Sequence, residues 1–319
     1  MKMDISVALT PELTLKNPIM SASGTFAYGE EFAEFFDLSI LGAVVTKGLS
    51  LAPKIGNHTP RIVEAPCGMI NSIGLENIGI PAFASHKLPF LRKFDTRVIV
   101  NFFGTTEDEY VRAAEALDIE GVSALEMNVS CPNVKKGGIE FGRDPAALHA
   151  LVRRVRQACG KPLIVKLSPM VTDIRENALA AQEALADALT CANTYPAMAI
   201  DEKTRRPILG NITGGLSGPA VKPMSLKIVW DVSRAVTIPV IASGGIMNAR
   251  DVIQFMLAGA TAVQVGSAGL RDPFCYPGII DDVGSFLEEH GVAAVNELIG
   301  GLLTTEKVPV GLSFLRNSF

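Results

Sequence analysis

Short apolar segments that alternate with helical segments constrain the fold of this chain more than any other feature. Eight segments have the apolar, small-ended character of buried parallel strands, at residues 18–22, 43–46, 97–102, 123–129, 163–167, 188–193, 239–242 and 262–265. Segments with helical periodicity separate most of them, at 108–117, 144–158, 174–186, 223–235 and 249–258. The pattern predicts an α/β fold of the (β/α)8 TIM barrel type. A doubly wound open sheet would also need a Gly-rich phosphate loop, G-x-G-x-x-G, which the sequence lacks.

The length and composition are consistent with one such barrel. A chain of 319 residues with 48% hydrophobic residues can bury parallel strands on both faces. Since no linker or repeat divides it, we expect a single domain over residues 1–303 and a C-terminal tail of unassigned order over 304–319.

Charge and apolar runs exclude several classes of partner. A net charge of -4 without a basic stripe argues against nucleic acid. The apolar runs are too short and too often interrupted to span a membrane, and residues 1–4 lack the apolar region of a secretory signal. We therefore expect a cytoplasmic protein without membrane association.

The cysteines indicate a reducing compartment and no metal centre. Five cysteines are scattered along the chain, without a C-x-x-C pair that would suggest zinc or an iron-sulfur cluster, and the four histidines are equally dispersed. The cysteines are Cys67, Cys131, Cys159, Cys191 and Cys275.

Three connections are too long to be simple turns between a strand and a helix. They cover residues 48–93, 131–143 and 195–222, and the third includes a turn at 201–207 between extended pieces. Long ordered loops commonly serve as lids or ligand contacts, so we expect all three to cover the C-terminal mouth of the barrel. The alternative is that they are surface decoration.

A cysteine follows the fourth predicted strand. The apolar run 122–127 breaks into Asn128, then Cys131 and Pro132, and then Gly137 and Gly138, which cannot prolong the strand. A thiol at the exit of a barrel strand is placed to move a proton, because binding and catalytic groups collect at that face. The alternative is that Cys131 is a small apolar residue at a turn.

Polar side chains at other strand ends indicate a ligand in the mouth. Lys47 directly follows the strand over 43–46, and Lys166 lies inside the strand over 163–167. A lysine buried at such a position requires an anion; for Lys166 the alternative is a structural ion pair with Glu126. Amides at three strand ends suit a planar, hydrogen-bonding ligand. They belong to Asn101, Asn128 and Asn193.

The last two strands end in small residues, Ser243-Gly244-Gly245 and Gly266-Ser267, and helical segments follow both. Such residues after strands seven and eight expose backbone amides and form the common phosphate site of this fold. Although any tight turn favours glycine, the position of these residues favours a phosphate-bearing ligand.

These motifs resemble a known family. Residues 128–138, Asn71-Ser72-Ile73-Gly74-Leu75, residues 213–223 and Ser243-Gly244-Gly245 are similar to class 1 dihydroorotate dehydrogenases, and most similar to the class 1B catalytic subunit, over residues 5–303. The resemblance implies an FMN-containing (β/α)8 barrel that oxidises (S)-dihydroorotate to orotate in pyrimidine (UMP) biosynthesis.

The resemblance also implies a role for each matching residue. Cys131 would remove the C5 proton while a hydride passes from C6 to flavin N5, and Lys166 would stabilise the reduced flavin. Residues expected to contact FMN are Ser23, Thr46, Lys47, Asn101, Asn128, Lys166, Ala192, Gly218, Gly244, Gly245, Gly266 and Ser267. Residues expected to contact the substrate are Lys47, Asn71, Ser72, Ile73, Gly74, Leu75, Asn128, Asn193 and Thr194.

Class 1B members pair with a subunit that carries FAD and a [2Fe-2S] cluster, in a heterotetramer that passes electrons to NAD. Cys131 in place of serine, the lack of an N-terminal membrane-binding extension and the 214–223 stretch favour this class. The alternatives are a class 1A homodimer that uses fumarate, or a phosphate-binding barrel without redox chemistry.

The sixth predicted strand departs from the family pattern at three positions. Relatives lead us to expect a glycine near Leu185, an aliphatic residue at Ala192 and a glycine at Ala197. Ala192 would remove bulk beside the expected flavin, whereas Leu185 and Ala197 would add bulk near the two ends of the strand.

Overall fold

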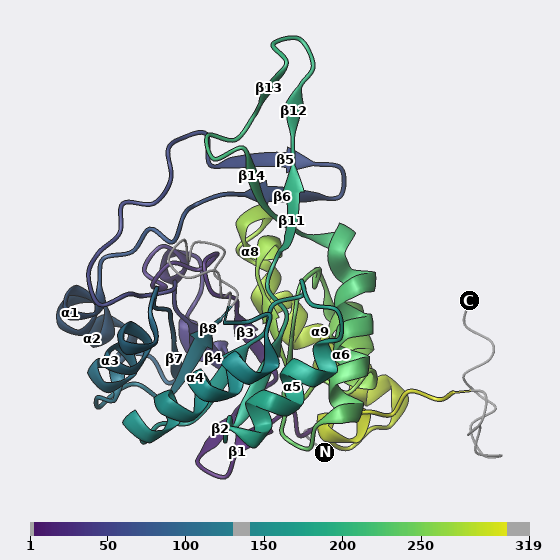
Figure 1. Ribbon diagram of the computed structural model, residues 1–319. Helices are drawn as coiled ribbons and strands as arrows, with labels where there is room; N and C mark the ends of the chain where they lie inside the picture. Colours follow the sequence, from purple (N-terminus) through teal and green to yellow (C-terminus); the bar gives the residue numbers. More distant parts are fainter. Residues whose placement is uncertain (1–2, 130–140, 305–319) are drawn as a thin grey trace.

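Eight parallel strands close into a barrel, which confirms the prediction from the alternating pattern (Figure 1). The computed structural model describes residues 3–129 and 141–304. Each predicted strand is present within one or two residues of its expected ends. In order around the barrel they are β3 (Ile19–Ser21), β4 (Ala43–Val45), β7 (Arg97–Phe102), β8 (Ala124–Asn128), β9 (Leu163–Lys166), β10 (Ala188–Cys191), β15 (Val240–Ser243) and β16 (Ala262–Val265).

Helices surround the barrel, and each longer helix buries one of its faces against the strands. In α4 (Pro145–Ala158), the side chains of Leu148, Leu151, Val152 and Val155 recur at helical spacing and are fully buried. The other outer helices are α1 (Ile80–Ala82), α2 (Leu88–Leu91), α3 (Glu107–Leu117), α5 (Ile174–Glu183), α6 (Lys222–Ala235), α7 (Ala249–Leu257), α8 (Ser267–Arg271) and α9 (Cys275–His290). A π-helical turn, η3 (Phe83–Lys87), joins α1 to α2, and short 3-10 turns are η1 (Phe32–Glu34), η2 (Leu38–Ile40), η4 (Pro219–Val221) and η5 (Val295–Leu298).

Polar side chains define where several of these helices begin. Thr106, Asp144, Asp173 and Asn248 precede α3, α4, α5 and α7, and each side chain accepts a hydrogen bond from a backbone N–H of the first turn. Those N–H groups have no partner within the helix, so a side-chain oxygen before it satisfies one of them.

The predicted helix over 174–186 is too long at its C-terminal end. Helix α5 ends at Glu183, because Leu185 takes the left-handed conformation with φ of 70° and turns the chain toward β10. Helical periodicity continues through this turn in the sequence, which is why the pattern did not reveal the end.

The first and third long connections meet in one antiparallel sheet. Its strands, in order, are β11 (Tyr195–Met198), β14 (Thr213–Ser217), β6 (Gly68–Asn71) and β5 (Ile62–Ala65). The sheet lies above the barrel, and the hairpin of β12 (Ile200–Asp201) and β13 (Arg206–Pro207) projects from it, whereas β1 (Val7–Thr10) and β2 (Leu13–Leu15) lie at the opposite end (Figure 1). The two connections therefore leave the same end of the barrel, as predicted.

Two expectations concern segments that the structure covers only in part. The second long connection, 131–143, is described from residue 141 onward, and the expected tail, 304–319, only at residue 304. Among the described residues, no helix is both long enough and apolar enough to span a membrane.

Candidate active site

A cavity of about 730 Å³ lies at the C-terminal ends of the barrel strands, beneath the antiparallel sheet. Its size is typical of sites for small molecules and cofactors. Residues from the barrel, from β6 and from β14 line it together. The barrel and the antiparallel sheet therefore enclose the cavity together.

The cavity brings together nearly all of the predicted site residues. Every residue expected to contact the substrate lines it, and so do eleven of the twelve residues expected to contact flavin, all except Thr46. The predicted residues at the cavity are Ser23, Lys47, Asn71, Ser72, Ile73, Gly74, Leu75, Asn101, Asn128, Lys166, Ala192, Asn193, Thr194, Gly218, Gly244, Gly245, Gly266 and Ser267.

Two predicted residues are not placed there. Thr46 is fully buried and does not line the cavity, because its hydroxyl donates to the backbone oxygen of Lys47 at 3.1 Å and accepts from the backbone N–H of Asn101 at 3.3 Å. Its hydroxyl supports the strand ends, and its contact with flavin stays a prediction. Cys131 lies outside the described residues.

A buried polar network crosses the barrel interior below the cavity. Glu126, fully buried on β8, accepts hydrogen bonds from Asn101 Nδ2 and Thr190 Oγ1, both at 2.7 Å, and from Gln264 Nε2. Lys166 Nζ lies 3.8 Å from Glu126 Oε1 and donates to Gln264 Oε1 at 3.2 Å.

The ion pair weighed as an alternative for Lys166 is thus present, and Lys166 also lines the cavity. A buried carboxylate is tolerated when several donors compensate its lost hydration, which this network provides. Lys166 therefore belongs both to this buried pair and to the cavity wall.

Asn101 carries an unfilled acceptor at the cavity wall. Its Nδ2 is taken by Glu126, but its buried Oδ1 has no hydrogen-bond partner among the described residues. Buried polar atoms without partners are uncommon, so this oxygen indicates that a ligand donor completes the site. The ring N–H of a flavin is a donor of this kind.

The segment from Asn71 to Leu75 lines the cavity and ends in two residues with left-handed backbone. Gly74 and Leu75 both have positive φ, 78° and 60°, and the Asn71 side chain donates to the Gly215 oxygen of the neighbouring strand at 3.3 Å. Asn57, which the sequence reasoning missed, donates to the Ser72 hydroxyl at 2.9 Å and also lines the cavity.

The asparagines at two strand ends contact each other. Asn193 Nδ2 donates to Asn128 Oδ1 at 3.2 Å, and the Tyr110 hydroxyl donates to the Asn128 backbone oxygen at 2.7 Å. These contacts hold both amides at the cavity wall, where the resemblance placed them in contact with substrate.

The glycines after β15 admit no larger residue. A Cβ on Gly244 would lie 2.5 Å from Ser225 Oγ, and one on Gly245 would lie 2.7 Å from Lys222 Cα; both glycines also have positive φ. The loop is braced from behind by Asp251, which pairs with Lys222 and accepts from the Met247 N–H at 2.8 Å. A backbone without side chains at the cavity wall suits the phosphate of the expected flavin.

Four cysteines lie within the described residues, and all except Cys67 are at least partly buried. Burial raises the pKa of Cys159 and of Cys191, and raises the pKa of Cys275 to about 12. None of these thiols lines the cavity.

Among the described residues, no cluster of three or more His, Cys, Asp or Glu side chains is arranged to hold a metal ion.

Among the further polar residues at the cavity that sequence reasoning missed are Gln264 and Ser168. Gln264 lies within the apolar run of β16 and contacts both Glu126 and Lys166, and Ser168 lies two residues beyond the end of β9. The signal for Gln264 was present, because a lone polar residue in a buried strand requires a partner just as Lys166 does. Nothing in the local pattern distinguished Ser168.

The chain matches a family model and curated proteins over most of its length. Residues 7–287 match the family model described as dihydroorotate dehydrogenase. Two relatives are named dihydroorotate dehydrogenase B (NAD(+)), catalytic subunit. The one from Geobacter sulfurreducens is 58% identical and covers 94% of this chain and 99% of the relative; the one from Geotalea uraniireducens is 57% identical and covers 95% and 99%.

A solved structure supports the same comparison. The crystal structure of DHODH from Eimeria tenella in complex with ferulenol matches with a TM-score of 0.77 and 25% sequence identity, and the match covers 93% of this chain and 88% of that chain.

Proposed function

Because the chain belongs to the dihydroorotate dehydrogenase family, we propose that the cavity at its barrel mouth is the site where dihydroorotate is oxidised to orotate. The enzyme is an oxidoreductase of pyrimidine biosynthesis. Membership in a family of dehydrogenases removes the alternative of a phosphate-binding barrel without redox chemistry. The observation that carries the proposed site is that one cavity gathers the residues expected for substrate and those expected for flavin.

The cofactor that fits the cavity is FMN. The backbone around Gly244, Gly245, Gly266 and Ser267 would hold its phosphate, and Asn101 Oδ1 would accept from its ring. Bound FMN would supply N5 as acceptor of the hydride from substrate C6. Lys166, held at the cavity wall by Glu126 and Gln264, would oppose negative charge that develops on the ring system.

Substrate would be held on the side of the cavity formed by the 71–75 segment. Its amides and hydroxyl, with Asn128, Asn193 and Thr194, offer donors and acceptors to the pyrimidine ring and carboxylate. Lys47 would pair with the substrate carboxylate, which supplies an anion for a lysine at the end of a buried strand.

We assign removal of the C5 proton to Cys131. Val129, the last described residue before its segment, and Gly142, the second described residue after it, both line the cavity, which supports a position of the thiol near the substrate. The thiolate takes the proton from C5, and the electron pair of that C–H bond forms the C5–C6 double bond as the hydride leaves C6.

We propose NAD as the final electron acceptor, reached through a partner subunit that carries FAD and a [2Fe-2S] cluster in a heterotetramer. The names of the relatives, which specify NAD(+) and a catalytic subunit, support this arrangement over the class 1A homodimer that uses fumarate. We also place the enzyme in the cytoplasm. The described cysteines, Cys67, Cys159, Cys191 and Cys275, are free thiols, which suits a reducing compartment.

The visible spectrum of the FMN-loaded chain under anaerobic conditions tests the site and the base together. Addition of dihydroorotate should bleach the flavin absorption of the wild type. Cys131→Ala should keep its flavin and bleach at least about 100-fold more slowly, because general base catalysis typically contributes that much or more.

Cys67→Ala is the matched control, since Cys67 is exposed and does not line the cavity. It should bleach at the wild-type rate. A Cys131→Ala protein that bleaches as fast as the control would remove the assignment of the base, and a wild type that does not bleach would remove the proposed site.

A further inference from the structure

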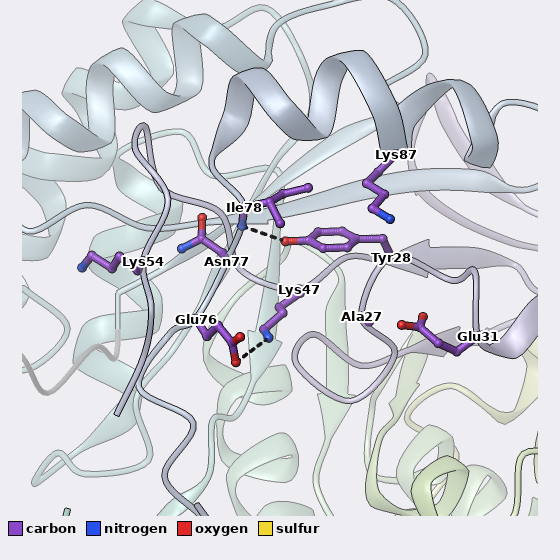
Figure 2. A pocket seen from close by; sticks show the side chains of 9 residues that line it. All are labelled: Ala27, Tyr28, Glu31, Lys47, Lys54, Glu76, Asn77, Ile78 and Lys87. Carbon is purple, nitrogen blue, oxygen red and sulfur yellow. Dashed lines mark hydrogen bonds and ion pairs between the residues drawn. The ribbon is translucent and has the colours of Figure 1, made fainter. Parts of the chain in front are cut away.

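A second, smaller cavity lies beside the main one and shares a lysine with it. Its volume is about 330 Å³, and Tyr28, Lys47, Lys54, Glu76 and Lys87 are among the residues that line it (Figure 2). Lys47 also lines the main cavity, so its side chain forms part of the wall between the two.

The Lys47 ammonium faces a carboxylate across the smaller cavity. Figure 2 shows the Lys47 and Glu76 side chains pointing toward each other, with Nζ 3.8 Å from Glu76 Oε2. The same Oε2 lies 2.6 Å from Nη1 of Arg61, which precedes β5. Glu76 thus stands between two cations, one of which reaches the main cavity.

The backbone holds Glu76 in this place. It directly follows the 71–75 segment, whose last residue, Leu75, has φ of 60°, and it directly precedes Asn77. Asn77 is anchored to Lys54 by backbone hydrogen bonds in both directions, at 2.9 and 3.0 Å, and its Nδ2 donates to Ser50 Oγ at 3.0 Å. Although the Glu76 side chain is 46% exposed, its Cα is therefore constrained on both sides.

The other lysines of the smaller cavity contact different groups. Lys87 pairs with Glu30, and the Lys54 ammonium lies 4.8 Å from the centre of the Phe103 ring. Among the described residues, Glu76 is the carboxylate that pairs with Lys47, the lysine that lines both cavities.

We propose that Glu76 is a positioning residue that acts through Lys47 and sets how tightly the site holds the carboxylate of substrate and product. The proposal rests on the proposed function, in which Lys47 binds that carboxylate. A ligand carboxylate that enters the main cavity must share the ammonium with Glu76 and is repelled by it. Glu76 therefore weakens anion binding and favours product release, because opposing carboxylates compete for one cation.

Glu76→Gln tests this directly, because it removes the charge and keeps the side-chain shape. Calorimetry on the FMN-loaded protein at low ionic strength should give a dissociation constant for orotate roughly two- to fivefold lower than in the wild type, the range typical of partly exposed ion pairs. Uracil, which has the ring without the carboxylate, should bind as in the wild type. The KM for dihydroorotate should fall together with the dissociation constant for orotate.

Two further variants separate this role from structural damage. Glu183→Gln removes a charge at the end of α5, away from the cavity mouth, and should leave orotate binding unchanged. Arg61→Gln leaves Glu76 without its second cation and should raise the dissociation constant for orotate relative to that for uracil. This ratio isolates the carboxylate and serves as the test if Glu76→Gln does not fold.

The outcomes are distinguishable from failure of the proposed function. Wild-type protein that does not bind orotate would remove the proposed function itself. Wild type that binds orotate, together with a Glu76→Gln variant that binds it equally or less tightly, would remove only the role of Glu76.

Discussion

Glu126 is the residue on which the interior of the barrel depends most. Its carboxylate is fully buried, and three side-chain donors and the Lys166 ammonium compensate it, from strands β7, β9, β10 and β16. Removing a carboxylate of this kind leaves a buried ammonium and several donors without their acceptor.

Glu126→Ala should therefore lower the free energy of unfolding of the flavin-free protein by about 3–5 kcal/mol. Urea unfolding followed by circular dichroism measures this loss. Glu115→Ala, on the exposed face of α3, is the matched control and should change stability by less than about 0.5 kcal/mol. A loss at Glu126 no larger than that of the control would show that the network contributes no stability.

At the level of elements, the end of α5 is closed by a motif that usually contains glycine. The N–H of Leu185 donates to the Gln182 oxygen at 2.9 Å and that of Ala186 to the Ala181 oxygen at 3.0 Å, the two hydrogen bonds of a Schellman motif. Leu185 occupies the left-handed position with φ of 70° and is half-exposed. The glycine that the family resemblance led us to expect here has a physical reason, because glycine alone adopts this conformation without steric cost.

Leu185→Gly should stabilise the protein by about 1 kcal/mol, since it relieves the left-handed conformation of a branched side chain that buries little surface. Thermal and urea unfolding measure the gain. Ala184→Gly, one residue earlier, where φ is -80°, should destabilise by a similar amount, because glycine relieves no strain there and adds entropy to the unfolded chain. Equal destabilisation by both substitutions would show that Leu185 carries no strain.

At the scale of the whole molecule, the cavity exists only in the folded chain. It is lined from the barrel strand ends and from a sheet whose strands β6 and β14 are far apart in the sequence. A ligand that fills it binds the native state and not the unfolded chain, so binding and stability are coupled.

Removal of FMN should accordingly lower the melting temperature, and the effect should depend on the concentration of free FMN. At a concentration 100 times its dissociation constant, FMN should add about 2.7 kcal/mol to the free energy of unfolding. Riboflavin, which lacks the phosphate, should add less at the same concentration if the Gly244 and Gly245 backbone holds that group. Equal effects of the two flavins would contradict the placement of the phosphate.

The site was predictable wherever one residue carried its own signal. Lys47 stood out as a charge at the end of an apolar strand, Lys166 as a charge within one, and Gly244 and Gly245 as paired glycines after the seventh strand; all line the cavity. The substrate segment was assigned through the family resemblance rather than from local chemistry. The roles of these residues, and that of Cys131, stay predictions that the experiments above test.

The sequence alone determined the barrel, because alternating apolar and helical segments record local burial and need no knowledge of distant partners. Tertiary structure decided everything that depends on which segments meet: the pairing of β6 with β14, the withdrawal of Thr46 from the cavity, the contact of Gln264 with Glu126, and the position of Glu76 against Lys47. The physical reason is that hydrogen bonds and ion pairs between distant residues leave no periodic trace in a sequence, and they are defined only when the folded backbone brings the groups within a few ångströms of each other.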